Sequence, residues 1–136
     1  MSQQNAETII RRVHEAFGHR DLEAIVALWA EDGLYEPALE RDIEGDAGVF
    51  RGHDGIRRWW QGMSEAWKDW DSEVHEVRQA GEQVLVFCTV RARGRLSDVV
   101  IEAPFFQLAT IRGGKIVASR DYSDRDEALE AAGLSE

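Results

Sequence analysis

The sequence is poor in cysteine, proline and basic residues. Only one of its 136 residues is cysteine, Cys88, so no disulfide can form within the chain. Its two prolines mark no linker. Lys and Arg total 16 against 26 Asp and Glu, which gives a formal net charge of −10. A chain this acidic lacks the basic face that binds nucleic-acid phosphates or anionic membranes, so we expect neither partner.

Long apolar runs and targeting patterns are also missing. No stretch approaches the roughly 20 apolar residues that a membrane-spanning helix needs. The first seven residues, Met-Ser-Gln-Gln-Asn-Ala-Glu, lack the basic and apolar segments of a secretion signal. We therefore expect a cytoplasmic protein. We also expect residues 1–136 to form a single domain, since this length suits one hydrophobic core.

Apolar periodicity predicts that helices come first. Residues 5–18 have the spacing of an amphipathic helix, and Asp21 offers an N-cap to a second helix that includes Trp29. A short strand over 33–39 and an acidic loop over 40–50 follow. A long helix is then expected to begin near Gly52 and to carry four of the five tryptophans: Trp59, Trp60, Trp67 and Trp70.

Strand signals dominate the second half of the chain. Strands are predicted over 72–79, 83–92, 99–112 and 115–122, with Gly113-Gly114 as a two-residue turn. A final helix over 124–132 has Leu129 as its apolar anchor and Gly133 as its stop. Helices followed by four antiparallel strands predict an α+β fold. A strongly curved antiparallel sheet with helices on its concave face makes a cone that encloses a pocket.

Several segments resemble the nuclear-transport-factor-2-like superfamily and, within it, the SnoaL-like polyketide cyclases. They are Asp-Leu-Glu-Ala-Ile-Val-Ala-Leu-Trp-Ala-Glu-Asp at 21–32, Arg-Gly-His-Asp-Gly-Ile-Arg at 51–57, and the C-terminal segments 114–117, 120–124 and 127–129. The resemblance implies a cone-shaped α+β fold and a homodimer through the outer face of the sheet. The superfamily includes cyclases, isomerases, epoxide hydrolases, dehydratases and non-catalytic binding proteins, so the resemblance implies fold more than function.

Period-two alternation assigns the two faces of the sheet. If Asp121 faces the pocket, Tyr122 faces outward, and Leu85 and Phe87 share that outer face. An outer face this apolar needs a cover, which a second subunit would supply. With the resemblance as a guide, the inward-facing residues of the last three strands include Val86, Cys88, Phe105, Gln107 and Ser119.

Asp121 is the leading catalytic candidate. The resemblance implies a catalytic acid/base, because an aspartate in a matching Arg-Asp-Tyr segment has this role in the cyclase and epoxide-hydrolase branches. Burial in an apolar cavity disfavours the charged form of a carboxylate, which suits it to proton transfer next to a carbonyl. The alternative is that Asp121 only caps the following helix or pairs with an arginine.

Two further residues are candidates for the chemistry. Gln107 could donate its amide N–H to a substrate carbonyl, or it could be a buried amide satisfied by the backbone. Tyr35 and Glu36 point to opposite sides of the first strand. We favour Tyr35 as the pocket residue with a hydroxyl donor, with Glu36 as the alternative.

Two better-defined branches of the superfamily fit the sequence poorly. Epoxide hydrolases of this fold need an Arg-x-Asp pair where this chain has Val84-Leu85-Val86. Ketosteroid isomerases have a base that aligns with Pro37, and a tyrosine on the first helix that falls near Val13. Neither reaction is therefore expected.

The tryptophans suggest the ligand. Trp59 and Trp60 diverge by about 100° around a helix, so one is expected to pack against the sheet while the other lines the cavity mouth with Met63. A wall of tryptophan, Phe105, valine and Cys88 would favour a flat hydrophobic ligand. The alternative is that the stripe is only core packing.

The four histidines show no metal-binding spacing, so neither a metal nor a cofactor is expected. His53 is interpreted as a helix cap or surface residue, and His14 could reach the edge of the cavity mouth.

The leading hypothesis is a cofactor-free cyclase or isomerase that acts on a small hydrophobic carbonyl compound. Asp121 would be the general acid/base, and Gln107 and Tyr35 would orient the substrate. The alternatives are a non-catalytic module that binds a small hydrophobic molecule, and a structural dimer with a collapsed core.

Overall fold

The computed structural model describes residues 3–37 and 48–135. The acidic loop expected over 40–50 lies outside this part of the chain, except for residues 48–50. The described helices are α1 (Gln3–Gly18), α2 (Leu22–Leu28), α4 (Gly52–Ala66) and α5 (Arg125–Ala132). The strands are β1 (Trp29–Glu36), β2 (Phe50–Arg51), β3 (Trp67–Ala80), β4 (Gln83–Gly94), β5 (Val100–Arg112) and β6 (Lys115–Tyr122).

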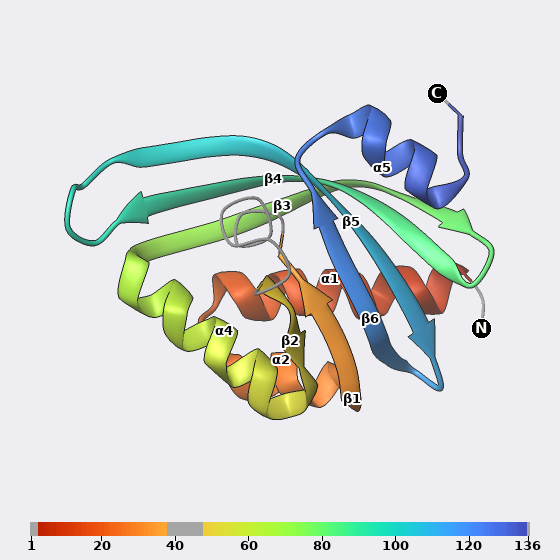
Figure 1. The fold of residues 1–136 in the computed structure, drawn as a ribbon, viewed down its shortest axis with the longest axis horizontal. Helices are drawn as coiled ribbons and strands as arrows, with labels where there is room; N and C mark the ends of the chain where they lie inside the picture. The colour runs from red at the N-terminus through yellow and green to blue at the C-terminus, as the bar shows by residue number, and fades with distance from the viewer. Residues whose placement is uncertain (1–2, 38–47, 136) are drawn as a thin grey trace.

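The strands form one curved sheet of six, in the order β2-β1-β6-β5-β4-β3 (Figure 1). Strands β3 to β6 make the predicted antiparallel meander, whereas β1 pairs parallel with β6. The predicted α+β class is therefore confirmed. None of the described helices is both long and apolar enough to cross a membrane.

Local signals read from the sequence fix several boundaries. The Asp21 carboxylate accepts a hydrogen bond from the Ala24 N–H at the start of α2. Gly113 and Gly114 have φ of 57° and 77°, which suits the tight turn between β5 and β6. Gly133 ends α5 in the left-handed conformation, with φ of 72°.

The prediction that one helix carries four tryptophans is wrong. The helix α4 ends at Ala66, and Trp67 and Trp70 belong to β3. A register shift between Trp67 and Asp69 leaves an extra residue in β3, so Trp67 pairs with Gly94 and Trp70 with Ala92. Two residues three apart thus share one face of a strand, a spacing that imitates a helix. Trp29 likewise begins β1 and does not belong to the second helix.

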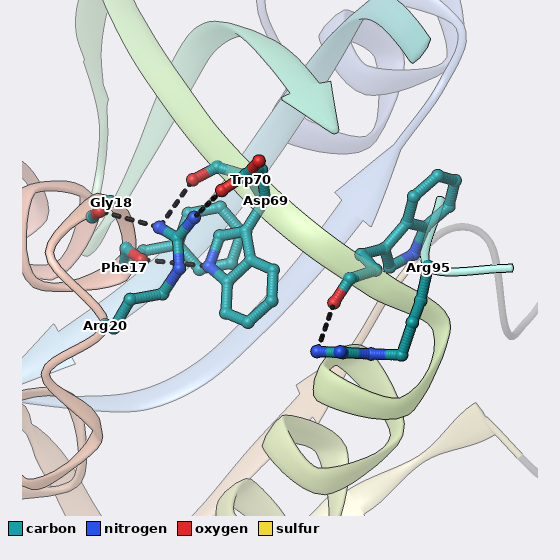
Figure 2. Close-up of polar contacts among 7 residues, drawn as sticks. Phe17, Gly18, Arg20, Asp69, Trp70 and Arg95 are labelled. Carbon is teal, nitrogen blue, oxygen red and sulfur yellow. Dashed lines mark hydrogen bonds and ion pairs between the residues drawn. The ribbon is translucent and has the colours of Figure 1, made fainter. Parts of the chain in front are cut away.

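Trp70 attaches the end of α1 to the start of β3 (Figure 2). Its indole N–H donates to the Phe17 carbonyl at 2.9 Å, and the Arg20 guanidinium lies 4.3 Å from the centre of its ring. Arg20 also donates to the carbonyl oxygens of Gly18 and Trp70, at 2.7 and 2.8 Å. The first helix is thereby held across the concave face of the sheet.

The two faces of the sheet bury different residues. Val84, Val86 and Cys88 pack in the concave-face core with α1 and α4. Leu85 and Phe87 pack on the other face in a separate cluster. This separation agrees with the predicted alternation.

The helix α5 lies on the outer face of the sheet (Figure 1). Its residues Ala128 and Leu129 are buried against Phe106, Leu108 and Tyr122. The chain itself therefore covers part of the apolar surface that suggested a second subunit. The homodimer through this face stays a prediction.

The segment Arg-Gly-His-Asp-Gly joins the start of α4 to β1. His53 is partly buried, and its Nε2 donates to the Trp29 carbonyl at 2.8 Å. Arg51 is the N-cap residue and makes no side-chain cap, so the expectation that His53 is a cap or a surface residue is wrong. A Cβ on Gly55, the second glycine of this segment, would lie 2.8 Å from the Phe50 carbonyl carbon. This close approach explains why the position is a glycine.

We predict that Gly52→Ala lowers the free energy of unfolding by about 1–3 kcal/mol. Gly52 has φ of +68°, and an added Cβ would lie 2.9 Å from the Glu31 carbonyl oxygen. Gly62→Ala in the same helix is the matched control, because nothing lies within 4 Å of its added Cβ. It should stabilise the protein by about 0.5–1 kcal/mol. Urea unfolding measures both variants, and equal midpoints would contradict the prediction.

Candidate functional site

Asp121 lies on β6 with its residue only 7% exposed. It pairs in register with Gln107 on β5, which is 5% exposed. Ser119, two residues before Asp121 on β6, is buried as well. Three buried polar side chains thus gather on neighbouring strands, in a sheet face that is otherwise apolar.

Tyr35 reaches Asp121 from β1. Its hydroxyl donates to Asp121 Oδ2 at 2.7 Å. The parallel pairing of β1 with β6 places Tyr35 opposite Ser119, so the two strands bring the phenol to the carboxylate. Glu36 points the other way, with its Oε2 3.7 Å from Arg120 Nε. The side of β1 that we favoured from the sequence is therefore the one that faces the site.

A chain of hydrogen bonds crosses the concave face beside Asp121. Ser72 Oγ on β3 lies 2.6 Å from His14 Nδ1, and His14 Nε2 lies 2.9 Å from Gln107 Oε1. Gln107 Nε2 then donates to Ser119 Oγ at 2.8 Å. We call these four residues the polar relay. Both ends of the Gln107 amide have side-chain partners, whereas the alternative drawn from the sequence was a backbone partner.

His14 is the main site residue that the sequence analysis undervalued. We expected that it could reach the edge of the cavity mouth, and its Nε2 in fact contacts Gln107 on β5, a partner that the sequence did not suggest. A signal for this position exists, because His14 follows the buried Ile10 by four residues and precedes Phe17 by three. Ser72 was missed altogether, and no pattern in the sequence marks it.

Burial keeps two groups near Asp121 uncharged. Desolvation lowers the pKa of His14 below its usual 6.5, although the hydrogen bond with Gln107 acts in the opposite direction. Burial raises the pKa of the Cys88 thiol, and the negative charge of Asp121 raises it further. Cys88 Sγ lies 4.0 Å from His14 Nε2. The pair is therefore a thiol and a neutral imidazole, so Cys88 is not an activated nucleophile.

Aromatic rings from α4 and from the sheet itself form an aromatic wall on the concave face. Trp59 is buried and meets the Tyr35 ring edge to face, with centroids 5.1 Å apart. Trp60 is partly buried and meets Trp70 in the same manner at 5.3 Å. Both tryptophans, together with Met63, pack against the concave-face core. Phe105 lies beside His14, with ring centroids 6.0 Å apart.

A hollow of about 300 Å³ lies away from Asp121, near the start of β3. Arg20, Trp70 and Arg93 help to line it, and Figure 2 shows the first two in contact. A ligand cavity at Asp121 stays a prediction. Among residues 3–37 and 48–135, no group of three or more His, Cys, Asp or Glu side chains is arranged to hold a metal ion.

Comparison with protein families identifies the chain. The SnoaL-like domain family matches residues 10–119, most of the chain. The protein belongs to this family. The match ends two residues before Asp121, so the position of that carboxylate is known from the structure and not from the family match.

Solved structures share the fold along nearly the whole chain of this SnoaL-like protein. A protein of unknown function from Burkholderia pseudomallei is 23% identical, with a TM-score of 0.78 and coverage of 96% of this chain and 97% of its own. IdmH, a candidate polyketide cyclase from Streptomyces antibioticus, is 24% identical, with a TM-score of 0.73 and coverage of 97% and 100%. TerC, crystallised with polyporic acid, is 23% identical, with a TM-score of 0.76 and coverage of 95% and 98%. None of the curated proteins compared with the chain matches it.

We predict that His14 makes the SnoaL-like protein less stable in mild acid. Its pKa is lowered in the folded chain but is near 6.5 when the chain unfolds. Below about pH 6.5 the unfolded chain therefore binds a proton that the folded chain does not, and stability falls by at most about 1.4 kcal/mol per pH unit. His14→Gln should flatten this slope between pH 7 and 5.

Urea unfolding at several pH values measures the effect. His19→Gln is the control, because His19 is exposed, and its slope should match that of the wild type. A His14→Gln slope equal to the wild type would contradict the prediction.

We also predict that the thiol of Cys88 reacts slowly with a disulfide reagent at pH 8 while the protein is folded. The thiol is buried and its pKa is raised, so little thiolate forms. Unfolding in guanidinium should release one thiol per chain at the rate of a free cysteine, which an absorbance assay follows. Equal rates for the folded and unfolded protein would show that the site is open.

Proposed function

We propose that this SnoaL-like protein is a cofactor-free cyclase or isomerase that acts on a hydrophobic carbonyl compound, with Asp121 as its general acid/base. The observation that carries the proposal is the buried Asp121 carboxylate, which accepts a hydrogen bond from Tyr35 and belongs to a residue paired in register with Gln107. A buried carboxylate beside apolar and aromatic side chains is suited to proton transfer at carbon.

The proposed reaction needs only these side chains. The Asp121 carboxylate takes a proton from the carbon next to a ketone, and the C–H electron pair becomes an enolate. A Gln107 N–H stabilises the charge on the enolate oxygen. In cyclisation, the enolate carbon attacks a second carbonyl of the same molecule, and the proton returns to the new alkoxide. In isomerisation, the proton returns to a different carbon.

The aromatic wall and the comparisons support the substrate class. Tyr35 and Trp59 provide flat apolar surfaces beside the carboxylate. IdmH, one of the similar structures, is a candidate polyketide cyclase. TerC was crystallised with polyporic acid. A flat, hydrophobic compound with two carbonyl groups fits these observations.

We predict that Asp121→Asn slows proton exchange at the substrate by about 10²–10⁴-fold. Exchange of α-protons for solvent deuterium, followed by NMR over a panel of aromatic ketones and diketones, measures the first step without knowledge of the product. Asp32→Asn, on an exposed part of β1, is the matched control and should keep wild-type exchange. If the wild type exchanges no proton, yet a ketone binds equally to the wild type and to Asp121→Asn, the binding-module alternative holds instead.

We predict that Tyr35→Phe moves the acidic limb of the exchange-rate profile to higher pH. The hydroxyl stabilises the charged form of Asp121, and a hydrogen bond to a charged group contributes about 1.5–3 kcal/mol. That corresponds to a shift of roughly one to two pH units. Tyr122→Phe makes the same change on the opposite face of the sheet and should leave the profile in place. An unshifted Tyr35→Phe profile would rule out this role for Tyr35.

A further inference from the structure

The polar relay has a direction, because each of its members can donate or accept only in certain ways. Gln107 Nε2 donates to Ser119, so Gln107 Oε1 is the atom that faces His14. An amide oxygen only accepts, so His14 Nε2 must carry a proton. A neutral imidazole then has no proton on Nδ1, and this atom accepts from the Ser72 hydroxyl at 2.6 Å.

This direction determines which end of the Gln107 amide faces β6. The oxygen is turned toward α1, and the nitrogen is turned toward β6, the strand that carries both Ser119 and Asp121. One N–H of Gln107 Nε2 donates to Ser119 Oγ, and the same nitrogen carries a second N–H. With the amide reversed, an oxygen would face β6 and would repel the oxygen of a substrate carbonyl.

We propose that His14 and Ser72 are positioning residues that hold the Gln107 amide with its N–H groups toward β6, the strand that carries Asp121, where the second N–H polarises a substrate carbonyl. The inference rests on the proposed function for the identity of that carbonyl. Neither residue touches the substrate. Their role is to make the orientation with Oε1 toward His14 and Nε2 toward Ser119 more stable than the reverse orientation.

The contacts support this role better than a purely structural one. Ser72, His14, Gln107 and Ser119 come from three different strands and one helix, and their contacts are between 2.6 and 2.9 Å. A reversed amide would need the other histidine tautomer, with the Nδ1 proton donated to Ser72. The tautomer of His14 therefore reports the orientation of the Gln107 amide directly.

Long-range ¹H–¹⁵N NMR of the ¹⁵N-labelled full-length protein at pH 7.5 tests the inference without any substrate. We expect His14 to be protonated on Nε2 and not on Nδ1. In Ser72→Ala the hydroxyl that donates to Nδ1 is lost, and a mixture of the two tautomers is expected. His75→Gln is the control, since His75 pairs with Thr89 in a separate exposed contact, 2.7 Å long. It should leave the His14 signals unchanged.

A His14 protonated on Nδ1 in the wild type would overturn the inference, because Gln107 would then present its oxygen to β6. A Ser72→Ala spectrum with the wild-type tautomer alone would also overturn the role of Ser72. On ketones that exchange, Ser72→Ala should lower the rate by about tenfold, and Ser72→Thr, which keeps the hydroxyl, should restore it. If the tautomers are as expected but Asp121→Asn exchanges at the wild-type rate, the proposed function fails while the orientation of the amide stands.

Discussion

The parallel pairing of β1 with β6 is the contact on which the site depends. It attaches the helical N-terminal part of the chain to the antiparallel meander, and it brings Tyr35 to Asp121 across 86 residues of sequence. The approach is close: a Cβ on Gly33 would lie 3.1 Å from the Ile116 carbonyl oxygen. A side chain there would push the strands apart, so a glycine in β1 helps to set the distance between the phenol and the carboxylate.

Much of the architecture could be predicted from local pattern, and the main failure has a physical cause. The meander, its two-glycine turn and the caps at Asp21 and Asp124 depend on neighbouring residues, which is why they are visible in the sequence. The bulges in β3 are not. The one between Trp67 and Asp69 sets Trp67 and Trp70, three residues apart, against partners only two apart, Gly94 and Ala92, and a spacing of three imitates a helix. Only pairing with β4 decides between the two structures.

The site shows the same division between local and long-range information. The family resemblance implied that Gln107 faces the interior. Strand alternation added that Ser119 shares the side of Asp121, because the side-chain period of a strand is two. Alternation could not predict that His14 reaches Gln107 across 93 residues, or that Ser72 completes the relay. Those contacts depend on how α1 crosses the sheet, and Trp70 and Arg20 fix that crossing through contacts with the end of the helix (Figure 2).

The neutrality of His14 suits the role of base that we propose for Asp121. A protonated imidazole in a low-dielectric interior would stabilise the charge of a nearby carboxylate and weaken its affinity for a proton. Desolvation lowers the pKa of His14 and leaves the imidazole neutral, so the relay orients Gln107 through dipoles and adds no net charge. The raised pKa of Cys88, whose Sγ lies 4.0 Å from His14 Nε2, likewise keeps that thiol uncharged. The chain has a formal net charge of −10. His14 and Cys88 nevertheless add no charge to the interior around Asp121. The Tyr35 hydroxyl donates a hydrogen bond to this carboxylate and helps to fix its position.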